Sequence, residues 1–206
     1  MKSLVHYIQE KLIIKKNKSS NNYNYFPESK EELKDIILKR IKEEGNEVDL
    51  NDIDVSNITD MSGLFTRTDF NGDISQWDVS NVTDMSYMFA ECNKFNQDIF
   101  QWDVSKVAFM KCMFYGCEKF NSDISNWDVS KVIYADSMFS NCKNFNQDIS
   151  KWDVSNVTNM YTMFFACSKF NQDISSWDVS NVKDYRYIFD YCPIEEKYKP
   201  KFKQNH

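Results

Sequence analysis

The chain has 206 residues, a net charge of −6 and 42% hydrophobic residues, which is enough for a buried core and too apolar for a disordered chain. Most of the negative charge lies between residues 50 and 192, with no lysine or arginine stripe, so nucleic acid is a poor candidate partner. No run of about 18 apolar residues and no secretory signal pattern occurs, so the sequence predicts no membrane span.

Residues 1–14 form an amphipathic segment that is too short to be a stable helix in isolation. Two interpretations stay open: the segment folds back on its own domain, or it docks the protein into a larger assembly. The apolar side chains that would carry out the docking are Leu4, Val5, Ile8 and Leu12. Residues 15–28 follow as a polar linker rich in asparagine and serine.

Residues 29–49 are predicted to hold a capping helix. Ser29 and Glu32 have the spacing of a capping box, so the helix should run from Lys30 to about Glu44. Gly45 should end it in a left-handed cap. An apolar stripe along one side indicates that this helix covers the first turn of the repeats that follow.

Residues 50–192 repeat one 25-residue unit, which is written DISQWDVSNVTDMSYMFAECNKFNQ at residues 73–97. All the tryptophans occupy one position of this unit, and cysteines occupy another. Because equivalent positions stack in such arrays, these residues and the repeated phenylalanines should form continuous ladders. The tryptophan and cysteine ladders comprise Trp77, Trp102, Trp127, Trp152, Trp177, Cys92, Cys117, Cys142, Cys167 and Cys192.

Each unit is predicted to contain a short strand and a short helix. Trp77 and Val79 alternate as on one face of a strand. From Val82 to Cys92 the apolar positions step by three and four, which is typical of an α-helical or 3-10 segment. The expected fold class is therefore an α/β solenoid of about six turns with an N-terminal helical cap.

The repeated string W-D-V-S-N-V-x-x-M-x-x-M-F-x-x-C-x-x-F-N-x-D-I-S resembles the BspA-like leucine-rich repeat family, the surface-protein 25/26-residue repeat of the DUF285 type. The resemblance implies a leucine-rich-repeat-like, right-handed coil. It also implies adhesion or protein binding, as in many members of the family. The secretion signal and surface anchor of those members are not seen in this chain.

The sequence predicts no enzyme, metal site or cofactor. The repeated region contains no histidine, since His6 and His206 lie outside it, so a nucleophile–histidine pair cannot form there. The stacked cysteines are expected to be small buried thiols. The repeated aspartates, such as Asp73 and Asp78, are expected to cap turns, with calcium binding as the alternative.

Positions that vary between copies could specify a partner, and aromatic residues at such positions are typical of binding patches. A partly buried filler role is the alternative. The candidate partner-binding residues are Phe100, Phe109, Tyr134, Tyr161, Phe165 and Tyr187.

Residues 193–206 are expected to form a loose polar tail after Pro193. The predicted function is a non-catalytic protein-interaction or scaffold module with an unidentified protein partner. A structural or decoration component of a virus particle or shell, docked through residues 1–14, and a cell-surface adhesin are the alternatives. The expected location is cytoplasmic or virion-associated, and the cell surface is the less favoured one.

Overall fold

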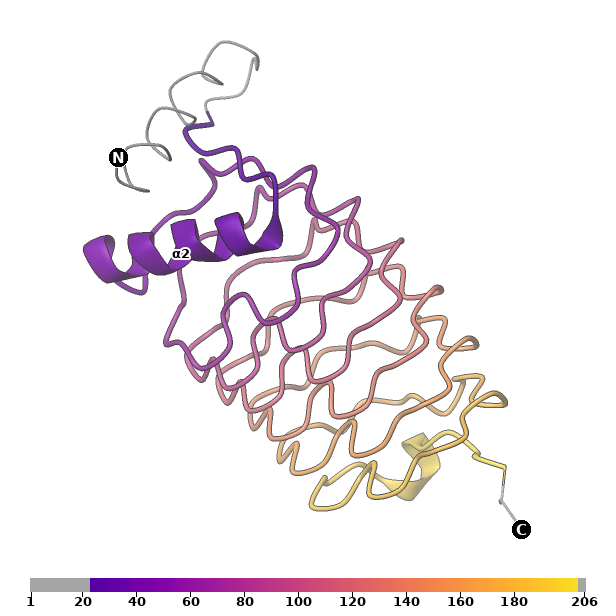
Figure 1. Cartoon of the computed structure of the whole chain (residues 1–206). Helices are drawn as coiled ribbons and strands as arrows, with labels where there is room; N and C mark the ends of the chain where they lie inside the picture. Colours follow the sequence, from indigo (N-terminus) through magenta and orange to yellow (C-terminus); the bar gives the residue numbers. More distant parts are fainter. Residues whose placement is uncertain (1–22, 204–206) are drawn as a thin grey trace.

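The structure, a computed structural model, describes residues 23–203, so the docking segment predicted at residues 1–14 lies outside the described residues. The chain winds into a stack of similar turns that runs from residue 50 to the C-terminal segment (Figure 1). Within residues 23–203 the helices are α2, Lys30–Glu44, and the 3-10 helix η2, Glu196–Tyr198. The leucine-rich-repeat class and the right-handed sense of the coil stay predictions.

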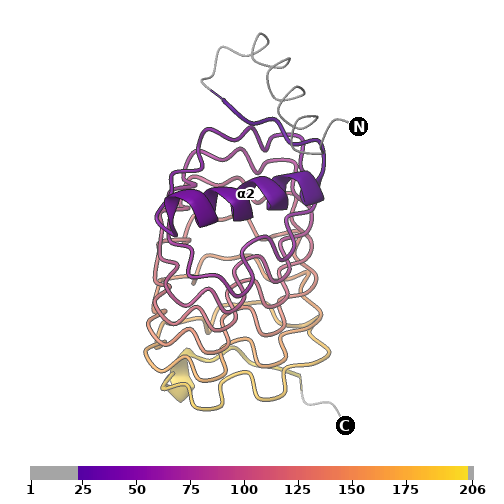
Figure 2. The same cartoon turned by 60° about the vertical axis from the view of Figure 1, so that its left-hand side comes forward.

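Helix α2 lies across the first turn of the stack (Figure 2). The Ser29 side chain accepts a hydrogen bond from the Glu32 amide at 3.2 Å, and the Glu32 carboxylate accepts one from the Glu28 amide at 2.7 Å. The first bond satisfies an amide that the start of a helix leaves without a partner, and the second ties the residue before the N-cap to the first turn of the helix. Gly45 ends the helix with φ 94° and ψ 175°, a positive φ outside the left-handed helical region that the sequence suggested.

Two buried side chains and three cations attach α2 to the first turn. Leu33 and Ile37 are fully buried. Lys30 donates to the Asp60 carboxylate at 3.1 Å, Lys34 donates to a backbone carbonyl of the turn, and Arg40 donates to Asp52. The apolar stripe of the helix therefore covers the end of the core, and its basic side chains bond to polar groups of the first turn around it.

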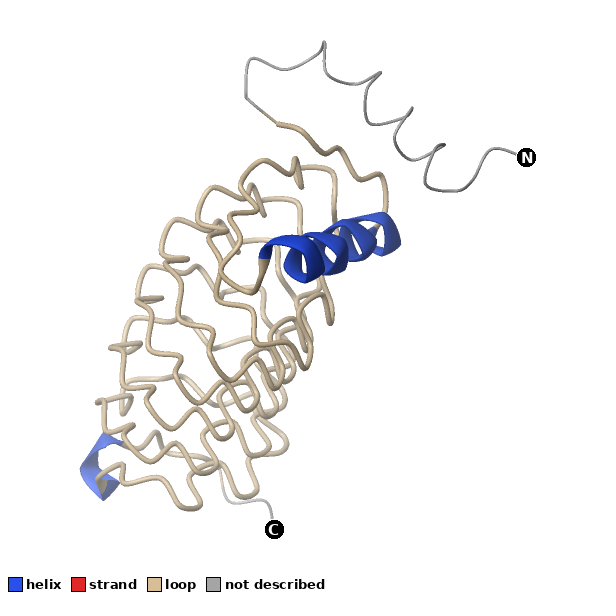
Figure 3. Cartoon of the chain, turned by 90° about the vertical axis from the view of Figure 1, so that its left-hand side faces the viewer, coloured by secondary structure: helices blue, strands red, loops and turns tan. Residues whose placement is uncertain are grey.

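The predicted strand and helix within each repeat differ from what the structure shows. Among residues 23–203 the inter-turn pairing consists of isolated parallel bridges, and the repeats hold turns in place of strands and helices (Figure 3). The amides of Met88, Ala90 and Cys92 each bond to the carbonyl three residues earlier. The three- and four-residue spacing of the apolar side chains therefore comes from consecutive tight turns.

The alternate amides of the same segment connect neighbouring turns. Met85, Tyr87 and Phe89 donate to the carbonyls of Phe109, Lys111 and Met113 at 2.8–2.9 Å. Two residues of this segment that lie four positions apart, Tyr87 and Glu91, have a positive φ of 59°. This left-handed conformation turns successive amides alternately inward along the chain and outward to the next turn.

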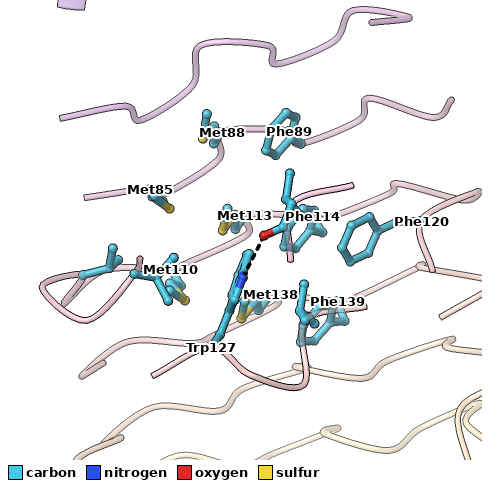
Figure 4. Packing of buried hydrophobic residues seen from close by; sticks show 14 of the residues in the cluster. Met85, Met88, Phe89, Met110, Met113, Phe114, Phe120, Trp127, Met138 and Phe139 are labelled. Carbon is cyan, nitrogen blue, oxygen red and sulfur yellow. Dashed lines mark hydrogen bonds between the residues drawn. The ribbon is translucent and has the colours of Figure 1, made fainter. Parts of the chain in front are cut away.

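The core is a set of apolar ladders that run along the stack. Phe89, Phe114, Phe139 and Phe164 are fully buried and stack with ring centroids 5.6–5.8 Å apart. Methionines lie beside the phenylalanines (Figure 4). The predicted phenylalanine ladder is thus confirmed, and each turn buries its inner face only against its neighbours.

Buried polar atoms of the core bond to the preceding turn. The Trp127 indole N–H donates to the Ile99 carbonyl at 3.1 Å, and the Cys142 thiol donates to the Phe114 carbonyl at 3.0 Å. Burial raises the pKa of the Cys142 thiol well above its usual value. Among the described residues every cysteine is a free thiol, as predicted for the ladder.

The repeated aspartates cap turns. The Asp103 carboxylate accepts from the Ser105 amide at 3.0 Å, and Asp148 caps Ser150 in the same way. Hydrogen bonds from the serine hydroxyl and amide lower the pKa of both carboxyl groups. These bonds are the turn-capping role that the sequence predicted.

The segment after Pro193 is packed against the last turn, where the sequence predicted a loose tail. Ile194 is 5% exposed, and Pro200 is also buried. The Ile174 amide donates to the Tyr198 carbonyl at 3.0 Å, and the Phe202 ring stacks on Tyr185 at 4.3 Å. Residues 193–203 therefore cap the C-terminal end of the core. Their high lysine content hid the few apolar side chains that do so.

Candidate binding surface

One position of the repeat forms a bridge between every pair of neighbouring turns and carries the main candidates. The bridges connect six residues in a single row along the stack, here called the bridge row: Asp60, Asp84, Phe109, Tyr134, Asn159 and Asp184. The two central turns carry an aromatic side chain at this position, and the four outer turns carry an aspartate or asparagine.

The outer residues of the bridge row have a structural role. Asp60, Asp84, Asn159 and Asp184 each accept a hydrogen bond from the backbone amide two residues later, at 2.7–3.1 Å. Such bonds stabilise tight turns. The aspartates and the asparagine at these four positions are therefore explained by the turn alone.

Phe109 and Tyr134 cannot form this bond, and the amides that they would cap have no acceptor. The structure has no hydrogen bond from the backbone amide of Lys111 or of Asp136 to any described residue. A backbone hydrogen bond contributes about 0.5–1.5 kcal/mol to stability. The two aromatic residues therefore replace a stabilising cap with a side chain that the turn does not need.

Both aromatic side chains are exposed in spite of their size. Phe109 is 38% exposed and Tyr134 is 43% exposed, and their rings stack at 5.8 Å with an interplanar angle of 11°. Exposed Ile133 is adjacent to Tyr134 in the chain, and exposed Tyr87 stands in the neighbouring turn. Neither residue is among the predicted candidates. Tyr87 could have been found, because it occupies the same repeat position as the candidate Tyr187, where the three intervening copies hold Cys112, Ser137 and Thr162.

A charged pair lies two residues along the chain from the stacked rings. The Lys111 ammonium is 3.2 Å from the Asp136 carboxylate, and Asp136 is almost fully buried. The hydrogen bond and charge of Asp136 raise the pKa of Lys111. This pair places charged groups beside the stacked rings of Phe109 and Tyr134. An apolar centre with a polar rim is the usual arrangement in protein interfaces.

The other predicted aromatic residues form two separate pairs toward the C-terminal end. Tyr161 and Tyr187 meet edge to face at 5.9 Å, with Arg186 over the Tyr161 ring, and Phe165 meets Tyr191 at 5.4 Å. Tyr191 is 80% exposed and was absent from the predicted set.

Phe100 stands apart from the other candidates. It lies in the first half of the repeat and lines a surface hollow with polar neighbours: Asn96, Asp98, Ser122 and Asp123. The structure therefore brings Phe109 together with Tyr134, pairs Tyr161 with Tyr187, and leaves Phe100 in different surroundings.

The repeats that build this surface identify the family. The family model described as "Mycoplasma protein of unknown function, DUF285" matches residues 37–144 and 123–200. The chain belongs to the DUF285 family. The predicted resemblance to BspA-like repeats is thereby confirmed. No curated protein and no solved structure matches the chain.

Between residues 23 and 203 there is no group of three or more histidine, cysteine, aspartate or glutamate side chains that could hold a metal ion. In the same range no helix has the length and apolar character needed to cross a bilayer.

Proposed function

We propose that this protein is a non-catalytic protein-binding module whose partner contacts the bridge row at Phe109 and Tyr134. The observation that supports this proposal is the loss of the turn cap at these two positions, because it lowers stability without burying the new side chains. Departures from local stability rules are concentrated at functional sites.

The chemistry of the row favours a partner with an apolar side chain at the centre of its interface. The stacked rings offer a rigid aromatic platform, and aromatic residues dominate the binding energy of protein interfaces. Asp84 and Asn159 bound the platform along the row, and the Lys111–Asp136 pair lies beside it. A partner that contacts all of these groups therefore needs polar groups around its apolar centre.

The first test replaces Phe109 and Tyr134 together, by Asp and Asn. We expect the double variant to fold, since these residue types cap the same turn in the neighbouring copies. Binding should weaken by at least tenfold, the effect of losing an interface hot spot of about 2 kcal/mol. The matched control is Phe100→Ser, which also removes an exposed aromatic side chain and restores the serine of the other copies.

The partner is identified by photo-crosslinking in extracts of the native source. A photoreactive phenylalanine analogue is placed at position 134, and a second variant carries it at position 100. We expect a protein that crosslinks from position 134, fails to crosslink from position 100 and disappears in the Phe109→Asp background. Equal crosslinking from both positions, or persistence after Phe109→Asp, would contradict the proposal.

A further inference from the structure

The last turn of the stack ends in backbone amides that have no acceptor. In each earlier pair of turns, alternate amides donate to carbonyls of the following turn, as Thr162, Phe164 and Ala166 donate to Arg186, Ile188 and Asp190 at 2.8–3.1 Å. The amides at the equivalent positions of the last turn form no hydrogen bond with any described residue. They belong to Tyr187, Phe189 and Tyr191 and are here called the open edge.

The C-terminal cap packs on side chains of the last turn, including the Phe189 ring beneath the Lys199 ammonium, and accepts no hydrogen bond from the amides of the open edge. Phe202 stacks on the Tyr185 ring, and the Lys203 carbonyl accepts from the Tyr185 hydroxyl at 3.2 Å. The one backbone–backbone hydrogen bond between residues 193–203 and the repeats runs from the Ile174 amide, in the first half of its unit, to the Tyr198 carbonyl, and the Glu195 amide donates to the Asn171 side chain. Tyr187 and Tyr191 are 54% and 80% exposed. The last turn is the yellow coil at the lower end of the stack (Figure 1).

An edge of this kind accepts another chain. Unpaired amides at the end of a hydrogen-bonded ladder are a template for strand addition, in which main-chain bonds supply affinity. Exposed Tyr187 and Tyr191 flank the Phe189 amide, so a bound chain would also contact aromatic rings. The open edge therefore has both parts of a peptide site: a row of donors and apolar side chains beside it.

A second copy of this protein does not fit the edge. Two open edges brought together would place donors against donors, because the equivalent amides of each earlier turn donate toward the following turn. A head-to-tail arrangement would need the carbonyls of the first turn, between residues 60 and 66. Helix α2 lies over that turn, with Leu33 and Ile37 buried and Lys34 bonded to the Gly63 carbonyl.

We infer that the open edge binds a peptide segment of another protein, which presents backbone carbonyls from alternate residues and takes the place of a further turn. The inference does not depend on the proposed role of Phe109 and Tyr134, which lie on earlier turns.

The test uses amide hydrogen exchange of the full chain, measured by NMR. The probe is a synthetic peptide with the sequence of residues 157–166, whose carbonyls at Asn159, Tyr161 and Met163 accept from the preceding turn in the intact protein. In the free protein the amides of the open edge should exchange fast, and those of Phe164 and Ala166 slowly. Added peptide should slow exchange at the open edge by about tenfold or more, and a peptide of scrambled order should not.

A double variant removes the aromatic flanks and keeps the backbone. Tyr187→Asn and Tyr191→Asn are suited to the positive φ of 59° and 58° at these positions, because asparagine tolerates this conformation. We expect the peptide to bind this variant at least tenfold more weakly, whereas the Phe109→Asp variant should bind it as the unmodified chain does.

Three results would overturn the inference. Slow exchange at the open edge in the free protein would mean that it is already covered, by residues 204–206 if a chain ending at residue 203 restores fast exchange. Slow exchange only at high protein concentration would identify a second copy as the occupant. Fast exchange that the peptide leaves unchanged would show that the edge does not take up a chain.

Discussion

The buried thiols contribute packing and hydrogen bonds to the core and are shielded from reagents in solvent. Cys117, Cys142 and Cys167 are fully buried, and each donates its S–H to a carbonyl of the preceding turn at 2.8–3.0 Å. Burial raises the pKa of all three thiols well above the ordinary value, because a thiolate cannot be solvated there. These cysteines should therefore be inert toward alkylation in the folded protein.

The raised pKa of these thiols predicts a loss of stability in alkali. The folded state holds the proton, whereas an unfolded thiol releases it near pH 9. The free energy of unfolding should therefore be constant below pH 9 with respect to these groups, and should fall as the pH rises above that value. Urea unfolding at a series of pH values measures this slope, and Cys142→Ala should make it shallower. An identical slope in the variant would contradict the assignment.

At the scale of the element, the left-handed position of each turn predicts a pair of substitutions with opposite effects. Gly116 and Ala166 occupy the same position in different copies, with φ 72° and 55°. A residue with a side chain lowers the stability by about 1–2 kcal/mol in this conformation. Glycine avoids this strain but loses more conformational entropy on folding, so the net difference between the two is smaller. We expect Ala166→Gly to stabilise the protein and Gly116→Ala to destabilise it, each by about 1 kcal/mol.

Chemical denaturation of both variants measures these differences. A Cβ at Gly116 would come no closer than 3.5 Å to Glu91, so no steric clash adds to the backbone term. The control variant is Gly45→Ala. Gly45 also has a positive φ, and no atom lies within 4 Å of an added Cβ there, so this variant isolates the effect of backbone conformation. Effects of the same sign in the Ala166 and Gly116 variants would show that packing, and not backbone conformation, decides stability at this position.

The core positions of the repeat were predictable from the sequence, and the backbone conformation of its second half was not. The 25-residue period places Trp127 and Phe114 in the core because stacking demands one apolar type per position, and both are buried. The helix predicted between Val82 and Cys92 is absent because Tyr87 and Glu91 adopt a positive φ without being glycine or asparagine. No local signal in the sequence marks such residues, since the inter-turn hydrogen bonds impose their conformation.

The candidate surface was predictable only in part for a related reason. Variation between copies correctly pointed to Phe109 and Tyr134 as exposed positions on one row, which the bridges and ring stacking place side by side. It also selected Phe100, which lines a different hollow. Repeat position alone cannot tell which side of a turn faces solvent, so the 80% exposure of Tyr191 was not predictable from its position.

At the scale of the whole molecule, the two ends of the stack are unequal. The first turn lies under α2, whose Leu33 and Ile37 are fully buried, whereas the open edge of the last turn keeps its amides free of any bond to a described residue. Head-to-tail contacts between unlike ends build open filaments when the contact does not close into a ring. Helix α2 therefore prevents another copy from stacking on the first turn. At the other end, two open edges cannot pair because both present only hydrogen-bond donors.

This asymmetry predicts that uncovering the first turn makes the protein self-associate. Replacing both Leu33 and Ile37 by Asp should detach α2, because burying two unpaired carboxylates is unfavourable. The carbonyl edge of the first turn would then pair with the open edge of another copy. Sedimentation velocity should show association that grows with concentration, and the peptide of residues 157–166 should suppress it by occupying the open edge. Lys39→Asp, an exposed change on the same helix, should leave the variant chain as a single species. A monomeric Leu33/Ile37 variant, or aggregates that the peptide does not reduce, would show that α2 has no role in limiting end-to-end stacking.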